Sequence, residues 1–195
     1  MPARSGTGRI WVGVFLGSSR GARSESGAGK VSGAQEVVYS GTGFSLRGEK
    51  GRFVLPPAFR KSVAESSDGK ILCLAKHERW NCLTGFGLSR KADLETQIAQ
   101  EQETAIRTGR DFDPDLRRMQ LFGFSEVPFD ASGRFVMPDH LAELGCLDGG
   151  VYFHGAGRFF FLWNPDELFR MGAGHEGAQA SCRSLLAREG KGGKG

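Results

Sequence analysis

A hexapeptide that occurs twice constrains the fold of this chain more than any other sequence feature. Gly51-Arg52-Phe53-Val54-Leu55-Pro56 recurs as Gly133-Arg134-Phe135-Val136-Met137-Pro138, and only the Leu/Met position differs. Each copy follows a turn-prone stretch and precedes a helix candidate that begins just after a proline, at residues 57–65 and 139–144. The duplication therefore predicts two copies of one small structural unit.

Paired apolar stretches follow each hexapeptide. They lie at residues 71–74 and 82–86 in the first copy, and at 151–153 and 159–163 in the second. Short apolar runs separated by polar or Gly-containing breaks predict a strand, a turn and a strand. Each unit is thus predicted as strand, turn, strand, short helix and hairpin, which makes the fold class α+β. Because one such unit leaves an apolar sheet face uncovered, we expect the two copies to pack on each other.

Helices are predicted outside the two units. Ser89 can cap a helix that runs towards Thr108, with Leu94 and Ile98 on one face. The remaining helix signals are cap-and-proline pairs or a helical composition, and they lie at residues 113–121, 164–169 and 179–188.

These signals divide the chain into segments. Residues 1–36 are rich in Gly, Ser and Arg and bury too little apolar surface to offset their ordering entropy. The expected segments are a disordered extension at 1–36, a first unit at 37–88, a helical linker at 89–123, a second unit at 124–169, and a C-terminal helix with a Gly/Lys tail at 170–195.

The net charge of +4 lies mostly at the N-terminus. Residues 1–36 carry five basic and two acidic residues, or +3, which leaves +1 for the rest of the chain. Binding of an anionic partner by the folded part would therefore depend on a local basic patch.

Several classes of protein are disfavoured by what the sequence contains. No apolar run reaches the length of a membrane span, so we expect no membrane contact. The cysteines are scattered without CxxC spacing, which argues against a zinc site or a disulfide framework. None of the histidines has a Cys or carboxylate at catalytic or metal-binding spacing. We therefore expect no enzyme activity, no metal, no cofactor and no small-molecule substrate.

Residues 48–56 and 130–138 resemble the two signature segments of the MraZ family, which belongs to the AbrB/SpoVT-like DNA-binding proteins. The resemblance covers about residues 38–188 and extends to the segments at 85–89 and 161–165. It implies two tandem AbrB/SpoVT-like units that form a swapped-hairpin β-barrel with peripheral helices.

The resemblance also implies a function. It points to a cytoplasmic, nucleoid-associated transcription regulator, usually a repressor, of cell-division and cell-wall genes. The partners that it implies are direct repeats in double-stranded promoter DNA and further copies of the same chain, assembled as a closed ring homo-oligomer.

Basic residues near the first hexapeptide are the candidates for DNA contact. Residues 47–61 hold five basic residues and one acidic residue, whereas residues 129–143 hold one basic and three acidic residues. Clustered cations neutralise phosphates and release counterions, so we expect the first copy to face DNA. The resemblance associates Lys50 and Arg52 with DNA. We assign Arg52 first and Lys50 second, with Arg47 and Arg60 as phosphate contacts.

The second copy keeps the family signature Asp-x-x-x-Arg as Asp130 and Arg134, which we expect to form a structural turn pair. The first copy departs from the signature, because Gly48 occupies the Asp position and Glu49 follows it. Either Glu49 substitutes for the missing Asp, or the first turn is looser. Since Arg52 lacks an Asp partner, a role in ligand contact is favoured for it.

The aromatic run at residues 159–163 bears on assembly. We expect it to exceed what a small core absorbs and to contribute to a subunit contact. Two other functions stay open: an AbrB-like antitoxin that binds DNA and a toxin, and a ring-forming scaffold without a DNA role. Tandem copies within one chain disfavour the antitoxin, and the basic cluster disfavours the scaffold.

Overall fold

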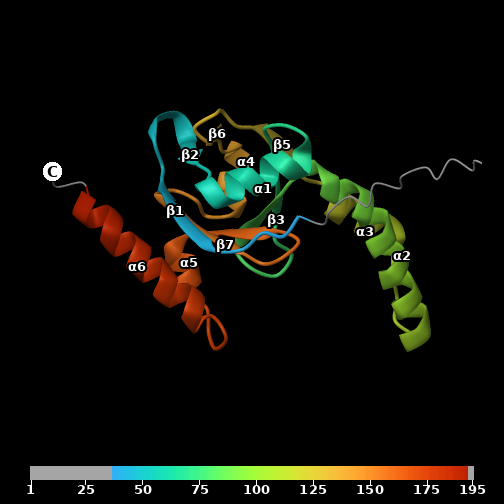
Figure 1. The fold of residues 1–195 in the computed structure, drawn as a ribbon. Coiled ribbons are helices and arrows are strands. Elements are labelled where there is room, and N and C mark those ends of the chain that lie inside the picture. Colours follow the sequence, from blue (N-terminus) through green and yellow to red (C-terminus); the bar gives the residue numbers. More distant parts are fainter. Residues whose placement is uncertain (1–36, 193–195) are drawn as a thin grey trace, which may run out of the picture. The chain divides into compact units, whose positions relative to one another are not determined.

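The computed structural model describes residues 37–192 (Figure 1), with side chains described as far as residue 190. The predicted disordered extension at 1–36 and the end of the Gly/Lys tail lie outside the described residues. The described part is a mixed α+β fold, as predicted, with an antiparallel six-stranded sheet, a two-stranded ribbon and flanking helices.

The two copies of the repeat form the same elements in the same order. In the first copy these are β1 (Thr42–Leu46), β2 (Arg52–Val54), α1 (Pro57–Ser67), β3 (Ile71–Lys76) and β4 (Cys82–Phe86). In the second copy they are β5 (Ser125–Pro128), β6 (Arg134–Val136), α4 (Asp139–Leu144), β7 (Gly150–Gly155) and β8 (Phe160–Trp163). The predicted order of strand, turn, strand, helix and hairpin is thus confirmed in both copies.

Each copy gives its first strand to the hairpin of the other copy. The sheet order is β1-β7-β8-β4-β3-β5, and every pair is antiparallel. β1 pairs with β7 of the second copy, and β5 pairs with β3 of the first. β4 and β8 pair at the centre, so equivalent strands occupy equivalent places on either side of an approximate two-fold axis.

The duplicated hexapeptide forms the second, two-stranded sheet. In this β2–β6 ribbon Phe53 pairs with Phe135, so the same axis passes through equivalent residues. Backbone hydrogen bonds flank the pair symmetrically, because Leu55 N–H donates to the Gly133 carbonyl (2.8 Å) and Met137 N–H donates to the Gly51 carbonyl (3.1 Å). The two copies therefore depend on each other for the hydrogen bonds of their hexapeptides.

The closed barrel that the resemblance implies is not found within residues 37–192. The six-stranded sheet is open, with β1 and β5 as its edges, and the β2–β6 ribbon is a separate sheet. Helices α1 and α4 lie with the ribbon over one face of the large sheet (Figure 1).

The large sheet separates two hydrophobic clusters, because successive side chains of a strand point to opposite faces. The paired residues Leu83 and Leu162 belong to the larger cluster, together with the ribbon, α1 and α4. The next pair, Cys82 and Trp163, belongs to the smaller cluster, which is covered by α5 (Pro165–Phe169) and α6 (Glu176–Gly192). The central strands are thus covered on both faces, which explains their continuous apolar sequence.

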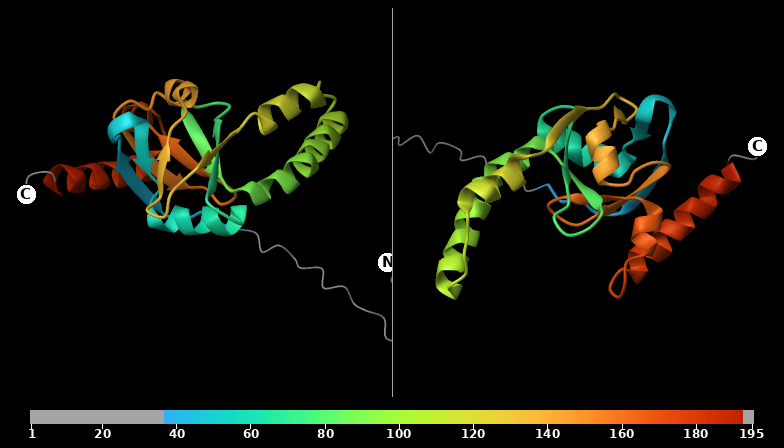
Figure 2. Two further views of the ribbon diagram at one scale, coloured as in Figure 1. Left: turned by 90° about the horizontal axis from the view of Figure 1, so that it is seen from above. Right: turned by 180° about the vertical axis from the view of Figure 1, so that it is seen from behind.

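A helical hairpin connects the two copies. Helices α2 (Lys91–Thr108) and α3 (Pro114–Phe122) run side by side and extend away from the sheet (Figure 2). Leu94 and Ile98 are buried on one face of α2, as predicted. The predicted cap of α3 is also confirmed, since the Asp113 carboxylate accepts hydrogen bonds from the N–H groups of residues 115 and 116.

The prediction that Ser89 caps α2 is wrong. A 3₁₀ turn, η2 (Leu88–Arg90), precedes the helix, and Arg90 takes the capping position without a side-chain hydrogen bond. The Ser89 hydroxyl instead lies 2.6 Å from the hydroxyl of Ser66 in α1. Ser89 therefore ties the start of the linker to the first copy.

The prediction that the aromatic run at 159–163 exceeds the capacity of the core is also wrong. Phe160, Leu162 and Trp163 are buried within this subunit, and the other two residues are half-buried. The run is absorbed because the sheet has a cluster on each face, so alternate residues enter different clusters. Among the described residues, the large exposed apolar side chains lie elsewhere, at Val38, Leu46, Val54, Ile106, Leu116, Met119, Phe122, Val136 and Leu144.

Candidate nucleic-acid interface

The turn between β1 and β2 presents Lys50 at its tip. Arg52 N–H donates to the Glu49 carbonyl, and Gly48 N–H donates to the Arg52 carbonyl at 2.7 Å. The two central residues, Lys50 (φ 57°) and Gly51 (φ 68°), both have positive φ, as a type I′ turn requires. Lys50 is exposed, and a non-glycine residue held in this conformation is uncommon.

The equivalent turn in the second copy is built differently. Asp130 accepts hydrogen bonds through Oδ1 from the N–H groups of Ser132 (2.8 Å) and Arg134 (2.9 Å), and its own N–H donates to the Arg134 carbonyl (2.9 Å). The hydrogen bond from the Arg134 backbone is the main cause that lowers the pKa of the Asp130 carboxyl, and the Arg134 charge contributes less. Asp130 and Arg134 therefore interact by hydrogen bonds between the Asp130 carboxylate and the backbone N–H of Arg134, and between the Asp130 N–H and the Arg134 carbonyl.

The first copy, which has Gly48 where the family signature has Asp, thus forms a different turn from the second copy. Gly48 has an extended backbone (φ −86°, ψ −176°) that any residue adopts, so its conformation does not require glycine. Without a carboxylate at this position, the first turn tightens onto the Glu49 carbonyl and places Lys50 and Gly51 in the left-handed region. Neither alternative raised by the sequence is observed, because no side-chain hydrogen bond caps this turn and the turn is tight instead of loose.

The outer face of the β2–β6 ribbon carries two arginines and two valines. Phe53 and Phe135 point into the core, so Arg52, Val54, Arg134 and Val136 point outward, and all four are exposed. Arg52 pairs with Val136, and Val54 pairs with Arg134. The two arginines are diagonal neighbours on one face of the ribbon, and such neighbours are about 7–8 Å apart.

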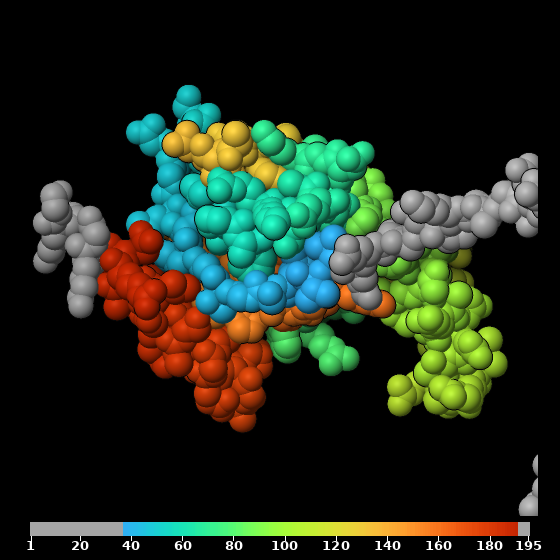
Figure 3. Space-filling model, in the orientation of Figure 1, coloured from blue at the N-terminus to red at the C-terminus, as the bar shows by residue number. Residues whose placement is uncertain are grey.

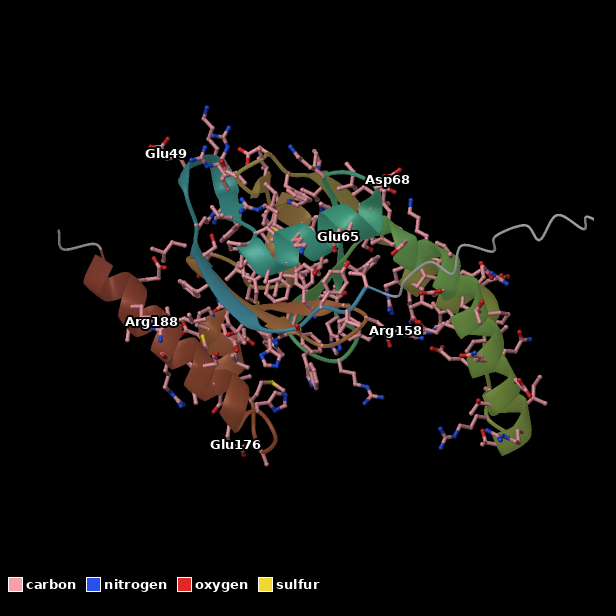
Figure 4. The ribbon with its side chains drawn as sticks, viewed as in Figure 1. Glu49, Glu65, Asp68, Arg158, Glu176 and Arg188 are labelled. Carbon is pink, nitrogen blue, oxygen red and sulfur yellow. The ribbon has the colours of Figure 1, made fainter. Side chains whose placement is uncertain are left out.

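The two predicted phosphate contacts lie at different ends of this surface. Arg47 follows β1 and is exposed, with Nη1 at 3.4 Å from the Asp148 carbonyl oxygen. Arg60, on α1, reaches the second copy's turn, where its Nη1 donates to the Ala131 carbonyl at 3.2 Å. The side chains of the β1–β2 turn stand out from the surface beside the second copy's turn (Figure 3), and nitrogen-bearing side chains surround Glu49 at the tip (Figure 4).

We use the name basic ribbon for this surface, defined as Arg47, Lys50, Arg52, Arg60 and Arg134. Two carboxylates, Glu49 and Asp130, lie in the same turns. The five cations outnumber these two carboxylates, so the charge of the surface is positive, and the Asp130 carboxylate accepts its hydrogen bonds from the backbone.

No group of three or more His, Cys, Asp or Glu side chains within residues 37–192 is arranged to hold a metal ion. No helix in the described part of the chain is both long and apolar enough to cross a membrane.

Sequence similarity to known proteins decides the family. A regulator from Rhodospirillum rubrum, named transcriptional regulator MraZ, is 34% identical over 122 residues, which cover 61% of this chain and 74% of the relative. The chain belongs to the MraZ family. A relative of the same name from Caulobacter vibrioides is 33% identical over 141 residues, which cover 72% of this chain and 81% of that protein. No family model matches the sequence.

The MraZ resemblance inferred from the duplicated hexapeptide is thereby confirmed. A further relative with the same name, from Chlorobium phaeobacteroides, is 28% identical over 126 residues and is covered over 81% of its length. The similarity therefore extends across bacteria and well beyond the two short signatures.

The signature Asp-x-x-x-Arg predicts a turn role for Arg134, and its place beside Arg52 is not evident from that signature. The structure brings Lys50, Arg52 and Arg134 to one surface, with Arg47 and Arg60 at its margins. The signal was present in the hexapeptide, where Arg-Phe-Val alternates outward, inward and outward in both copies. Only the pairing of β2 with β6 shows that the two arginines share a face.

Proposed function

We propose that this MraZ chain is a transcription regulator that binds double-stranded DNA through the basic ribbon. The observation that carries the proposal is the outward face of the β2–β6 ribbon, where Arg52 and Arg134 lie diagonally beside two exposed valines. Arginine binds guanine edges and phosphates through a planar pair of donors. Exposed valine methyl groups suit apolar contact with thymine methyl groups.

The dimensions of the ribbon suit the major groove. This groove is about 12 Å wide and admits a two-stranded β-ribbon. The approximate two-fold axis through Phe53 and Phe135 presents one arginine from each copy, so the two arginines would address neighbouring base pairs symmetrically. Lys50, at the tip of the adjoining turn, would reach the backbone or a base edge at the margin of the groove.

Arg47 and Arg60 are proposed as phosphate contacts. Each already donates to a backbone carbonyl, Asp148 for Arg47 and Ala131 for Arg60, which holds the guanidinium near the surface. Phosphate contacts position a protein on the duplex and contribute most of its salt-dependent affinity. Asp130 is proposed as a structural residue that holds the turn from which Arg134 begins.

The wider role follows from the family. We propose that the chain represses cell-division and cell-wall genes from direct repeats upstream of them, as a ring homo-oligomer in the cytoplasm at the nucleoid. We also propose that the exchange of β1 and β5 between copies is the tandem form of the interleaved hairpins of AbrB/SpoVT-like proteins. Several basic ribbons in one ring would bind consecutive repeats with an affinity raised by effective concentration.

DNA binding is tested by titrating the full chain against a labelled duplex of the region upstream of its own operon. Arg52→Ala and Arg134→Ala should each weaken specific binding by about 1–3 kcal/mol, and each should lower the salt slope by about 1. Arg107→Ala is the matched control, because Arg107 is exposed on α2 and its loss changes the net charge equally. Unchanged binding by both ribbon variants would exclude the basic ribbon and favour a scaffold without a DNA role.

Assembly is tested separately. Light scattering at micromolar concentration should give a mass of several subunits. Removing one of two repeats from the duplex should lower the affinity by much more than the twofold expected from the loss of one of two independent sites. A monomer with full affinity for a single repeat would refute the ring. Co-purification of a stoichiometric protein partner that displaces DNA would favour the antitoxin alternative.

A further inference from the structure

A cavity of about 340 Å³ lies between the β3–β4 hairpin, α2 and α3, apart from the basic ribbon. Its volume falls within the range of small-molecule sites, about 300–1,000 Å³. Large apolar side chains form much of its lining, namely Trp80, Phe86, Leu94, Leu121 and Phe159. The size and the lining fit a small organic molecule with an aromatic ring.

The charged group of Arg90 lies in the wall of this cavity. Its guanidinium carbon is 5.6 Å from the ring centroid of Phe86 and 5.5 Å from that of Phe159. Its side-chain hydrogen bond to Gln97 Oε1 is long, at 3.5 Å, and no carboxylate within residues 37–192 forms an ion pair with it. Removing a cation from water costs free energy, and without an ion pair this cost is only partly offset.

Electrostatics around Arg90 favour an anion. Burial and then the positive charge of Arg158 lower the pKa of Arg90, while Asp93 and Tyr39 partly offset this shift. Arg158 lies at the β7–β8 turn, towards the start of α2 (Figure 4). A carboxylate placed against Arg90 would pair with a guanidinium that is already partly removed from water.

The charged residues of the lining are mostly cations. Three cations line the cavity, Lys76, Arg79 and Arg90, against a single carboxylate, Glu78. Glu78 is engaged by Arg117 of α3, and Lys76 donates to the backbone carbonyls of His77 and Trp80. The carboxylate of the lining is thus engaged, Lys76 is bonded to carbonyls and Arg79 is exposed. Arg90 is therefore the half-buried cation of the lining for which residues 37–192 offer neither an ion pair nor a short side-chain hydrogen bond.

Arg117 ties together the three elements that line the cavity, and we call this set of contacts the clamp. Arg117 donates from Nη2 to Glu101 Oε1 of α2 at 2.9 Å and also binds Glu78 in the β3–β4 loop. This clamp fixes α3, which contributes Gln120 and Leu121 to the lining. A site that is already formed in the free protein binds more tightly, because less conformational entropy is lost when the ligand binds.

We propose that this cavity binds a small aromatic anion, of the aromatic carboxylate class, whose charged group pairs with Arg90 and whose ring lies among Phe86, Phe159 and Trp80. Arginine suits this role because its planar fork binds a carboxylate through two parallel hydrogen bonds and stacks on aromatic faces. The lining of the cavity shares no residue with the basic ribbon. The proposal does not depend on DNA binding.

The test uses 8-anilinonaphthalene-1-sulfonate, an aromatic anion, as the probe for the full chain. Binding is followed by probe fluorescence and by energy transfer from tryptophan, because Trp80 lines the cavity. Arg90→Gln should weaken binding about tenfold, since a charge-assisted contact is lost. Arg183→Gln is the matched control, because the Arg183 guanidinium lies 5.1 Å from the Phe169 ring, outside the cavity lining, and it should bind as the parent does.

A neutral relative of the probe, N-phenyl-1-naphthylamine, separates charge from shape. It should bind the parent and Arg90→Gln equally. If Arg90→Gln loses both probes, the cavity has collapsed, and Arg90→Lys then decides: restored binding of the anion supports the proposal, and no restoration overturns it. Unchanged binding of the anion by Arg90→Gln, or an equal loss in Arg183→Gln, overturns it directly.

Discussion

Phe53 and Phe135 hold the same position in the two hexapeptides and face each other across the β2–β6 ribbon, with ring centroids 6.2 Å apart. Both rings are almost completely buried, with 1% and 2% of their surface exposed. Their burial directs the arginine before each of them outward, because side chains alternate along a strand. The pair therefore joins the core of the protein to the position of its basic ribbon.

The two glycines that end the turns should tolerate alanine to different degrees. Gly51 (φ 68°) and Gly133 (φ 82°) both have positive φ, so alanine costs about 1–2 kcal/mol at either position. At Gly133 an added Cβ would also lie 2.8 Å from the Leu55 carbonyl oxygen, whereas at Gly51 the nearest atom is Arg47 Nη2 at 3.6 Å. Gly133→Ala should thus lower the free energy of unfolding by at least about 1 kcal/mol more than Gly51→Ala. Urea denaturation of the two variants measures this difference, and equal losses would contradict it.

Lys50→Gly should have opposite effects on stability and on DNA binding. Lys50 has φ 57°, which is strained for a residue with a Cβ, so glycine should raise the free energy of unfolding by about 1 kcal/mol. The same change removes a cation of the basic ribbon and should weaken operator binding. Lys50→Asn is a useful control, because it removes the charge while tolerating the left-handed conformation. Strong operator binding by both variants would remove Lys50 from the proposed interface.

Asp130→Ala should destabilise the second turn in a pH-dependent way. The Asp130 carboxylate accepts two backbone hydrogen bonds, and its pKa in the folded state lies below the ordinary value of 3.8. A lowered carboxyl pKa stabilises the fold above the unfolded-state pKa, and this contribution is lost as the pH falls through the folded-state value. The melting temperatures of the parent and of Asp130→Ala should therefore differ at pH 7 and converge below about pH 3. A difference that persists in acid would point to packing instead.

Arg117→Met should destabilise the contact of the α2–α3 hairpin with the β3–β4 loop. The Arg117 side chain is 15% exposed and pairs with Glu101 and Glu78, so its loss should cost about 1–3 kcal/mol. Arg118→Met is the matched control, because Arg118 forms pairs with Glu95 and Asp115 that are much more exposed. Chemical denaturation at pH 7 should show a clear loss for the first variant and little change for the second.

The Arg117 pairing also has a pH signature. The hydrogen bond from Arg117 is the main cause that lowers the pKa of Glu101 below 4.5, and burial opposes it. Its stabilising effect is present above that value and disappears as the pH falls through the folded-state pKa. Between about pH 5 and pH 3 the parent should therefore lose more stability than Arg117→Met. Parallel pH profiles for the two proteins would show that the pair contributes little.

The sequence by itself determined the duplicated unit, its order of elements and the family. These features depend on local signals: the repeated hexapeptide, short apolar runs, and the caps at Asp113 and Asn164, whose side chains accept hydrogen bonds from the helix N–H groups that follow. Such signals act over a few residues and can be recognised in one dimension. The basic cluster of the first copy is likewise evident from the sequence, because the charged residues can be counted without a structure.

The tertiary structure decided which copies pair and which side chains share a surface. The exchange of β1 and β5, and the place of Arg134 beside Arg52, follow from pairing between strands that lie far apart in the chain. Ser89 bonds to Ser66 because α1 approaches it in space, and the aromatic run is absorbed because helices cover both faces of the sheet. In each case the deciding contact joins residues that lie far apart in the sequence, so no local pattern specifies it. Side-chain alternation was readable from Arg-Phe-Val, but the partner strand that completes the surface depends on the fold.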